Sequence, residues 1–226
     1  MGAAVAYTVL ADILGRHDPA VLRRGPASSG LVGLSFDDGP HPELTPRVLD
    51  ALAAAGGHAT FFVVGQNVRR HPEIVRRIVA EGHALGVHTD SHRHAWTLSP
   101  AATRQQIAGG LQAITDVAGV RPRWFRPPWG AFNLTTRRLA AGLGLRIALW
   151  SCDAGDWLPG ASPGAILRRV QRGIAPGAVI DLHDGGQVLP GCRAMTASLP
   201  AMLAAIARAG LRSGHLGELL GETAHN

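Results

Sequence analysis

The chain has 226 residues, of which 46% are hydrophobic and 17% charged, so it can bury a large core and is not a disordered protein. Its formal net charge is +6, and all 22 basic residues are arginine. The arginines occur mostly as pairs on expected helices and not as one dense run, which argues against a nucleic-acid-binding protein. The length fits a single large α/β domain.

The first 29 residues form an N-terminal segment that we expect to be helical and packed on a main domain covering residues 30–226. No positive charge precedes its apolar run and Asp12 interrupts that run, which is unlike a secretory signal. We find no stretch of about 20 uncharged apolar residues that could span a membrane. We therefore expect a cytoplasmic protein. Peripheral membrane contact through the N-terminus stays open, and a truncated start would allow an envelope or secreted protein.

Two cysteines, Cys152 and Cys192, are too few for a disulfide framework in a chain of this length. We expect two ordinary buried thiols, although the sequence leaves open whether they pair.

Short apolar runs alternate with helical periodicities along the chain. Strands are predicted at residues 31–36, 59–64, 84–88, 145–152 and 178–182, with a short extended stretch at 124–125. Helices are predicted at residues 45–55, 72–81, 100–118, 135–142, 163–172 and 197–209. This alternation is typical of βαβ units around a parallel sheet, and it fits a barrel or a doubly wound sheet equally well.

Polar side chains that could do chemistry follow the predicted strands. In chain order they are Asp37 and Asp38, His88 and His92, Arg126, Asp153 and Asp156, and His183 and Asp184. Because the carboxyl ends of parallel strands share one face, these side chains are predicted to meet in one active site.

No single one of these motifs is specific. An adjacent Asp pair before Gly-Pro can be a polar turn, and a His-x-x-x-His pair arises easily in a chain with 11 histidines. Together, one carboxylate and two imidazoles make a three-ligand set that leaves a metal position open for water. The other carboxylate of the pair is then free to act as a general base.

Five segments carry a resemblance. In order they read SFDDGP, HTDSH, RPPWG, DAGDW and LHD, and they extend from residue 35 to residue 184. Together they resemble the polysaccharide deacetylase family, also called carbohydrate esterase family 4, which includes nodulation-type chito-oligosaccharide deacetylases. The resemblance implies a single-domain, distorted TIM-like (β/α) barrel with about seven parallel strands.

The resemblance also implies the roles of the first three motifs. Asp37 would be the catalytic base, held ionised by Arg126. Asp38, His88 and His92 would bind a divalent metal, most often zinc, with cobalt, nickel or manganese as alternatives.

The last two motifs would supply the general acid and part of the pocket. His183 would be the acid, supported by either Asp153 or Asp156, a choice that the sequence leaves open. The substrate would contact Pro127, Trp129, Gly130, Trp157 and Leu182. Within that set, the resemblance gives the backbone N–H of Trp129 to the oxyanion and Leu182 to the acetyl methyl group.

The sequence departs from the family pattern at two places. Trp129 stands where a tyrosine is common, and Asp90 stands where an aromatic residue is common. The expected activity is removal of N-acetyl groups from GlcNAc- or MurNAc-type sugars of chitooligosaccharide or peptidoglycan. The alternatives are an amide hydrolase acting on a lipid-linked or small acylamino sugar, and an inactive homologue that binds glycan.

Overall fold

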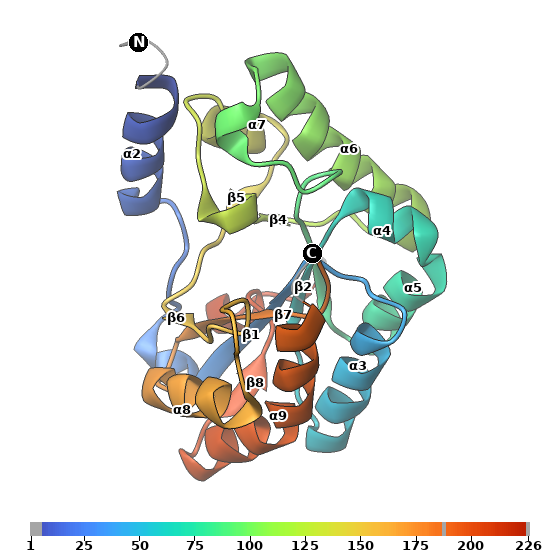
Figure 1. The fold of residues 1–226 in the computed structure, drawn as a ribbon, viewed down its shortest axis with the longest axis vertical. Coiled ribbons are helices and arrows are strands. Elements are labelled where there is room, and N and C mark those ends of the chain that lie inside the picture. The colour runs from blue at the N-terminus through green and yellow to red at the C-terminus, as the bar shows by residue number, and fades with distance from the viewer. Residues whose placement is uncertain (1–5, 187–188, 225–226) are drawn as a thin grey trace.

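A curled parallel sheet forms the centre of the protein, with helices around its outside (Figure 1). The structure is a computed structural model, and it describes residues 6–186 and 189–224. The sheet contains β1 (Leu31–Asp37), β2 (Thr60–Val63), β3 (Ala84–Val87), β4 (Trp124–Phe125), β5 (Arg146–Ile147), β6 (Cys152–Asp153), β7 (Val179–His183) and β8 (Arg212–Gly214).

Seven strands follow the order β5-β4-β3-β2-β1-β7-β6, and the short β8 pairs with the beginning of β1. Every strand pairing in the described chain is parallel. The predicted distorted, TIM-like barrel of about seven parallel strands is therefore confirmed. β1 lies in the middle of this order and all seven of its residues are buried, which explains its uninterrupted small and apolar sequence.

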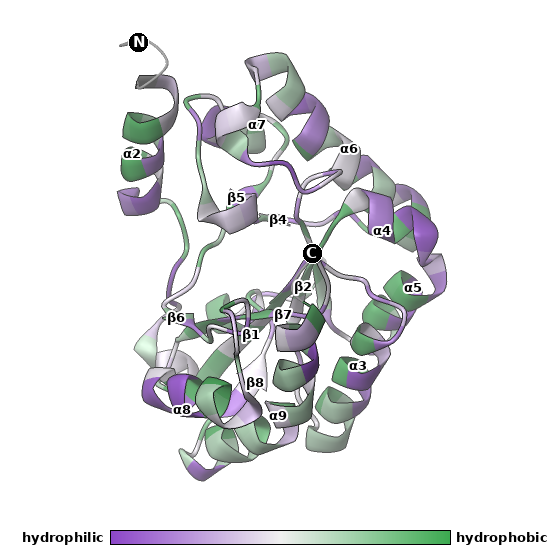
Figure 2. Ribbon diagram, viewed as in Figure 1, coloured by the Kyte–Doolittle hydropathy of each residue, from purple (hydrophilic) through white to green (hydrophobic). Residues whose placement is uncertain are grey.

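The helices cover the sheet through their apolar faces. They are α3 (Leu44–Ala55), α4 (Gly65–Arg70), α5 (Pro72–Ala80), α6 (Pro100–Ala118), α7 (Thr136–Gly142), α8 (Pro163–Gly173) and α9 (Leu189–Arg208). In α5, for example, Ile74, Val75 and Ile78 are buried, while the polar residues of the helix lie outside (Figure 2). Serine side chains cap α6 and α8, each followed by proline at the first helical turn.

The prediction of one strand at residues 145–152 is wrong, because the segment forms two short strands, β5 and β6. Residues 148–151 lie between them and belong to neither strand, although Ala148 forms an isolated bridge with Leu22. The buried guanidinium of Arg126 donates hydrogen bonds to the backbone carbonyls there. Its Nε donates to the carbonyl of Ala148 (3.2 Å), and its Nη2 donates to the carbonyl of Leu149 (3.1 Å). The apolar pattern of the segment reflects burial and not a continuous ladder.

The last helix is longer than predicted. The sequence predicts a start at residue 197, whereas α9 begins at Leu189 and contains Pro200. Buried apolar residues on both sides of the proline hold the helix against the fold, and tertiary packing overrides the local breaker. By length and composition α9 alone, among the helices of the described chain, could cross a membrane, and half of its apolar window is buried in the fold.

The N-terminal segment is helical over part of its length. A π-helical turn (η1, Ala6–Leu10) continues into α2 (Ala11–His17), and the segment 18–26 has no helix. In Figure 1, α2 stands at the edge of the molecule. Leu22 then forms a bridge with Ala148, beside the break between β5 and β6. Both cysteines of the chain are buried free thiols.

Candidate active site

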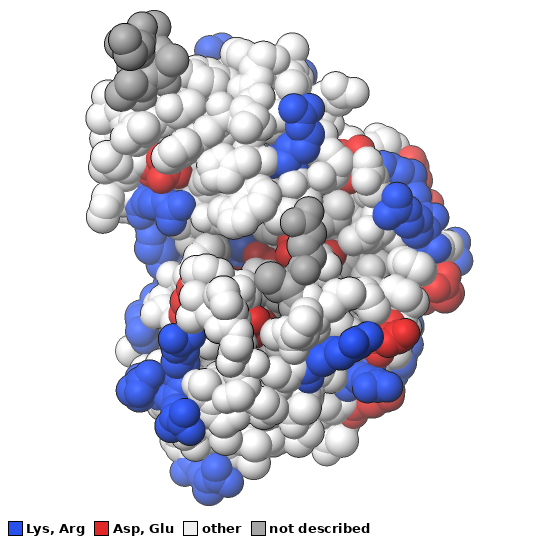
Figure 3. All heavy atoms as spheres, viewed as in Figure 1, with Lys and Arg blue, Asp and Glu red and all other residues white. Residues whose placement is uncertain are grey.

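A cavity of about 430 Å³ opens at the carboxyl ends of the central strands. Its lining residues are Arg16, Asp37, Asp38, His88, His92, Trp129, Trp150, Asp153, Trp157, Asp181 and His183. Figure 3 shows red carboxylate atoms on the floor of a hollow near the centre of this face, with arginines toward the edges. The topology thus brings side chains from both ends of the sequence into one site, as parallel α/β folds do.

The two adjacent aspartates reach the same cavity because the backbone turns sharply between them. Successive side chains of a strand point to opposite faces, so Asp37 and Asp38 would diverge if β1 continued. Asp38 instead has φ of 72°, in the left-handed region. The other non-glycine residues with positive φ in the described chain are Thr89, His92 and Trp129, in the segments that follow β3 and β4. Such unfavourable backbone conformations cluster at functional sites.

Asp38, His88 and His92 form a ligand set that fits a divalent metal. Oδ1 of Asp38 is buried and accepts no hydrogen bond, yet it lies 2.9 Å from Nε2 of His92 and 3.3 Å from Nε2 of His88. Nδ1 of His88 donates to the carbonyl of Arg126 (2.8 Å), which leaves its Nε2 lone pair facing Asp38. All three ligand atoms lie within 4.8 Å of one another, and three N and O donors suit a catalytic metal with an open position.

The ionisation of Asp38 supports this assignment. Burial acts to raise the pKa of Asp38, but the adjacent imidazoles of His88 and His92 outweigh it and hold that pKa far below its ordinary value. Asp38 is therefore a carboxylate, the form that binds a cation.

Asp37 is held by Arg126, whose side chain is completely buried. Nη1 of Arg126 donates to Oδ1 of Asp37 (2.7 Å) and also to Oδ1 of Asp181 (2.6 Å). Burial raises the pKa of Asp181 well above its ordinary value, the charge of Asp37 adds to this, and Arg126 opposes it. Asp37, Asp181 and His183 also have ligand atoms within 4.8 Å of one another, but the guanidinium already bridges the two carboxylates.

His183 and Asp156 form a second acid–base pair. Nδ1 of His183 donates to Oδ1 of Asp156 (2.9 Å), and the backbone N–H of His183 donates to Oδ2 (2.7 Å). Burial acts to lower the pKa of His183, but Asp156 and the charges of Asp181 and Asp37 raise it well above its ordinary value. The imidazole is therefore a protonated group at the cavity, with Nε2 left for a substrate.

Asp153 has a different partner from Asp156. It accepts hydrogen bonds from the backbone N–H of Gly155 (2.7 Å) and from Nε1 of Trp157 (3.1 Å). The geometry thus links Asp156 to His183 and Asp153 to an aromatic side of the cavity. Asp184, which follows His183, is buried away from the cavity, and its Oδ2 accepts from Oγ1 of Thr45.

The residues expected at the substrate divide into two groups. Trp129 and Trp157 line the cavity and are 54% and 45% exposed, and the Trp129 ring lies 4.4 Å from that of His92. Pro127, Gly130 and Leu182 do not line it. Leu182 packs in the hydrophobic core, because Asp181 and His183 on either side of it occupy the cavity face of β7.

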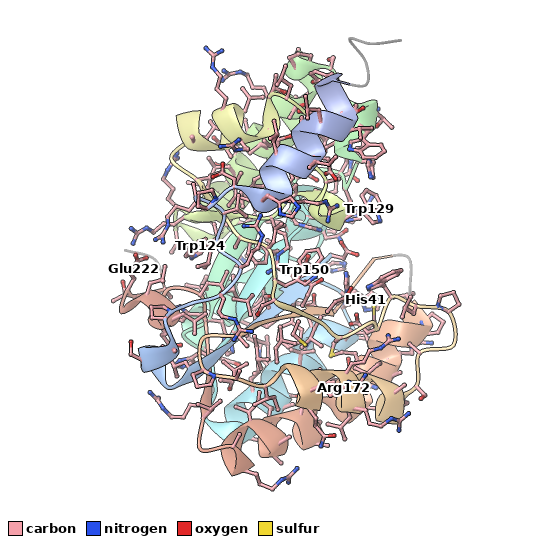
Figure 4. The ribbon with its side chains drawn as sticks, turned by 90° about the vertical axis from the view of Figure 1, so that its left-hand side faces the viewer. His41, Trp124, Trp129, Trp150, Arg172 and Glu222 are labelled. Atoms are coloured by element: carbon pink, nitrogen blue, oxygen red, sulfur yellow. The ribbon has the colours of Figure 1, made fainter. Side chains whose placement is uncertain are left out.

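Three lining residues were missed by the sequence reasoning: Asp181, Trp150 and Arg16. A signal existed for Asp181, since it is a lone acid in a buried strand, two residues before His183 and so on the same face. Trp150 lies in the interrupted segment between β5 and β6, in the middle of the molecule in Figure 4. Arg16 comes from α2, and nothing in the local sequence ties it to the cavity.

Comparison with known proteins identifies relatives over most of the chain. The family model for polysaccharide deacetylase matches residues 24–148. A peptidoglycan-N-acetylglucosamine deacetylase of Bacillus cereus is 36% identical over 178 residues, covering 78% of this chain and 64% of that protein. A chitooligosaccharide deacetylase of a Bradyrhizobium strain is 40% identical over 157 residues, covering 68% of this chain and 70% of the relative.

Solved structures agree with the sequence relatives. The structure of the Bc1960 peptidoglycan N-acetylglucosamine deacetylase superposes with a TM-score of 0.85 at 31% identity, over 92% of this chain and 95% of that one. A carbohydrate esterase family 4 pseudoenzyme from Bacillus anthracis superposes with a TM-score of 0.80 at 29% identity, over 90% of this chain and 69% of that one. By fold, by motif and by sequence, the chain belongs to the polysaccharide deacetylase family.

Proposed function

We propose that the protein is a metal-dependent hydrolase that removes N-acetyl groups from GlcNAc- or MurNAc-type sugars, in chitooligosaccharide or peptidoglycan. One observation carries the proposal. The unpaired Oδ1 of Asp38 faces two imidazole Nε2 atoms, while a second carboxylate, Asp37, lies beside them with a partner of its own. A ligand set and a separate base in one cavity are what metal-assisted hydrolysis requires. The names of the relatives support the substrate class.

Asp38, His88 and His92 would hold the metal, which we propose to be zinc; when bound, it would polarise the acyl carbonyl and acidify the attacking water. Asp37 accepts the proton of that water. Arg126 fixes Oδ1 of Asp37, so the other oxygen, 3.8 Å from Nε2 of His88, faces the ligand set. The base and the ligands then act from neighbouring positions without competing for the same atom.

His183 donates a proton to the leaving amine, which is a poor leaving group unless it is protonated. Asp156 keeps Nδ1 as the donor nitrogen and leaves Nε2 toward the substrate. The backbone N–H of Trp129 would stabilise the oxyanion. The indoles of Trp129 and Trp157 would stack on sugar faces, while Pro127, Gly130 and Leu182 would shape the walls behind them.

An inactive glycan-binding homologue is the competing hypothesis, and one structural neighbour is a pseudoenzyme. The base, the ligand set and the acid are all present at this cavity. This weighs in favour of an active enzyme.

The test is acetate release from chitopentaose and from purified peptidoglycan, measured after chelation and again after zinc is returned. Chelation should abolish release and zinc should restore it. Asp37→Asn should lower kcat by roughly 10²–10⁴-fold, the usual contribution of a general base. The variant should still bind zinc stoichiometrically, because Asp37 is not among the proposed ligands.

Asp90→Asn is the matched control, since Asp90 is a carboxylate in the loop of the histidine ligands but pairs with Arg69. It should keep most of the activity. Full activity of Asp37→Asn, or activity that is indifferent to chelation, would contradict the mechanism. No acetate from either glycan, with zinc still bound, would redirect the search to lipid-linked or small acylamino sugars.

A further inference from the structure

Seven of the eight large hydrophobic side chains that the described chain exposes lie on η1–α2 or on the segments that follow β3 and β4, and the eighth is Trp157. Four of them lie on the helical segment η1–α2, and two line the cavity. They are Val9, Leu10, Ile13, Leu14, Trp96, Trp129, Leu134 and Trp157. Exposed apolar residues scattered singly need no explanation, but a gathered set indicates an interaction surface.

The apolar face of the helical segment η1–α2 points away from the protein. Ala11, Asp12 and Gly15 face the protein, while Val9, Leu10, Ile13 and Leu14 are 40–56% exposed. Their spacing of i, i+1, i+4 and i+5 places these four side chains on one outer face. Figure 2 shows the hydrophobic colour on part of α2, which stands at the edge of the molecule, and the hydrophilic colour at its lower end. A helix with this orientation is suited to an apolar environment outside the protein.

Specific polar contacts fix this orientation. Oδ1 of Asp12 accepts from the backbone N–H of Phe132 (2.7 Å), and its Oδ2 accepts from Nε of Arg16 (2.8 Å). Nη2 of Arg16 donates to the carbonyl of Trp129 (3.1 Å). Gly15 packs so closely that a Cβ there would lie 2.5 Å from the ring of Phe132. The helix therefore cannot turn its apolar face inward without breaking these contacts and clashing with the ring.

The apolar surface continues from the helix to the cavity. The backbone N–H of Leu134, a residue that is 65% exposed, donates to the carbonyl of Tyr7 (2.8 Å). The ring of His94 contacts both Trp96 (5.3 Å) and Trp129 (5.0 Å). In Figure 4, Trp129 lies beside the lower part of α2. We call the exposed residues of η1–α2 together with Trp96, Trp129 and Leu134 the outer rim.

The charges beside the outer rim are almost all positive. Residues 6–23, 93–97 and 129–138 contain five arginines and two aspartates. Both aspartates are paired, Asp12 with Arg16 and Asp18 with Arg137. An outward apolar helix, flanking arginines and tryptophans at the boundary are the features of a helix that lies in the headgroup layer of an anionic bilayer.

A second copy of the chain fits this surface less well. A symmetric dimer through the outer rim would bring two sets of arginines together without compensating carboxylates. It would also cover Trp129, which lines the cavity.

We propose that the outer rim docks the protein on the surface of an anionic membrane, with η1–α2 in the headgroup layer and the cavity opening beside it. Docking rests on the rim and its charges alone and does not depend on the proposed deacetylase activity.

The test is cosedimentation with vesicles of equimolar phosphatidylglycerol and phosphatidylcholine, and with vesicles of phosphatidylcholine alone. The full chain should bind the anionic vesicles and bind the neutral ones much more weakly. The double variant Ile13→Glu, Leu14→Glu should weaken partitioning by about tenfold or more, because two large aliphatic side chains no longer enter the bilayer. Both positions are exposed, so the fold should be retained.

The matched control is Ala53→Glu, Ala201→Glu, which adds the same charge at exposed alanines of α3 and α9. It should bind nearly as well as the unmodified protein. If both double variants lose binding to anionic vesicles equally, the loss is due to net charge alone and the proposal is wrong. So would an absence of binding to anionic vesicles at low salt, or a dimer in solution that the Ile13 and Leu14 substitutions dissociate.

Discussion

The two carboxylates at the end of β1 show how a single residue's surroundings decide its role. Asp37 has Arg126 on one oxygen, and Asp38 has two imidazoles on one oxygen and no hydrogen bond to it. Adjacent like charges would repel if both were left bare in a buried site. Because each has a separate cationic or metal-binding partner, both can be ionised and can do different work.

The pairing of His183 with Asp156 gives a prediction for the pH dependence. A general acid must be protonated, so kcat/KM should fall as the pH rises through the pKa of His183, which is raised in the folded protein. Asp156→Asn removes the charge that opposes burial, so this pKa should fall. The alkaline limb of kcat/KM should move to lower pH by about one unit or more.

Asp153→Asn is the control for this experiment, because Asp153 binds Trp157 and the backbone of Gly155 and makes no hydrogen bond to His183. It should leave the alkaline limb in place, whatever it does to KM. If the alkaline limb of kcat/KM is unchanged in Asp156→Asn, a group other than His183 controls that limb.

Most of the residues gathered at the cavity could be predicted from sequence, because each follows a strand within a short motif. Asp181 was missed although strand alternation puts it on the same face as His183, and Arg16 has no such signal. Asp181 reaches the site through Arg126, 55 positions away, and Arg16 through the carbonyl of Trp129, 113 positions away. Contacts at such separations are set by the tertiary fold, so the sequence does not show that Asp181 binds Arg126 or that Arg16 reaches the cavity.

At the scale of elements, the interruption between β5 and β6 serves the site. A continuous strand through residues 148–151 would use the carbonyls of Ala148 and Leu149 in a ladder. Instead they accept from Arg126, whose guanidinium also lies 4.2 Å above the ring of Phe62. The break in the sheet thus supplies two of the four hydrogen bonds that fix the partner of Asp37.

Arg126→Lys should therefore be strongly destabilising although it keeps the charge. A lysine ammonium cannot reproduce the planar fork that serves two carbonyls and two carboxylates. The free energy of unfolding, measured in urea, should fall by about 3–5 kcal/mol, the usual cost of breaking a buried ion pair.

Arg146→Lys on β5 is the comparison for that measurement. Arg146 is paired with Glu222 at a half-exposed site. This change should cost about 0–1 kcal/mol. If the free energy of unfolding falls by similar amounts in the two variants, the buried guanidinium of Arg126 contributes no more than the half-exposed one of Arg146.

Elements with strong periodicity were predicted well, and α6 has the expected bounds of residues 100–118. The short elements α4 and β8 were not predicted. α4 has six residues and β8 has three, too few for a hydrophobic period to show. β8 exists because it pairs with the beginning of β1, a partner about 180 residues earlier in the chain.

At the scale of the whole molecule, a second group of titratable residues gathers around the starts of β2 and β3 and the end of β8. The ring of His83 lies 5.7 Å from that of His58 and 5.5 Å from Phe61, and His58 in turn contacts His215 and Glu218. His83 is 1% exposed and neither of its ring nitrogens has a hydrogen-bond partner. A buried imidazole of this kind is held neutral by its surroundings and charges only at a cost to the fold.

This group should make the protein sensitive to acid. Burial, helped by the charges of His58 and His215, lowers the pKa of His83 from 6.5 to about 4. The unfolded chain therefore takes up this proton first, and stability should fall as the pH drops from about 6.5 to about 4, by about 3 kcal/mol. His83→Leu should flatten the fall in unfolding free energy over that range in urea titrations. His71→Leu, at a partly exposed position, should leave the slope unchanged. If the curves of His83→Leu and the unmodified protein run parallel from pH 7 to pH 4, the acid sensitivity belongs to other groups.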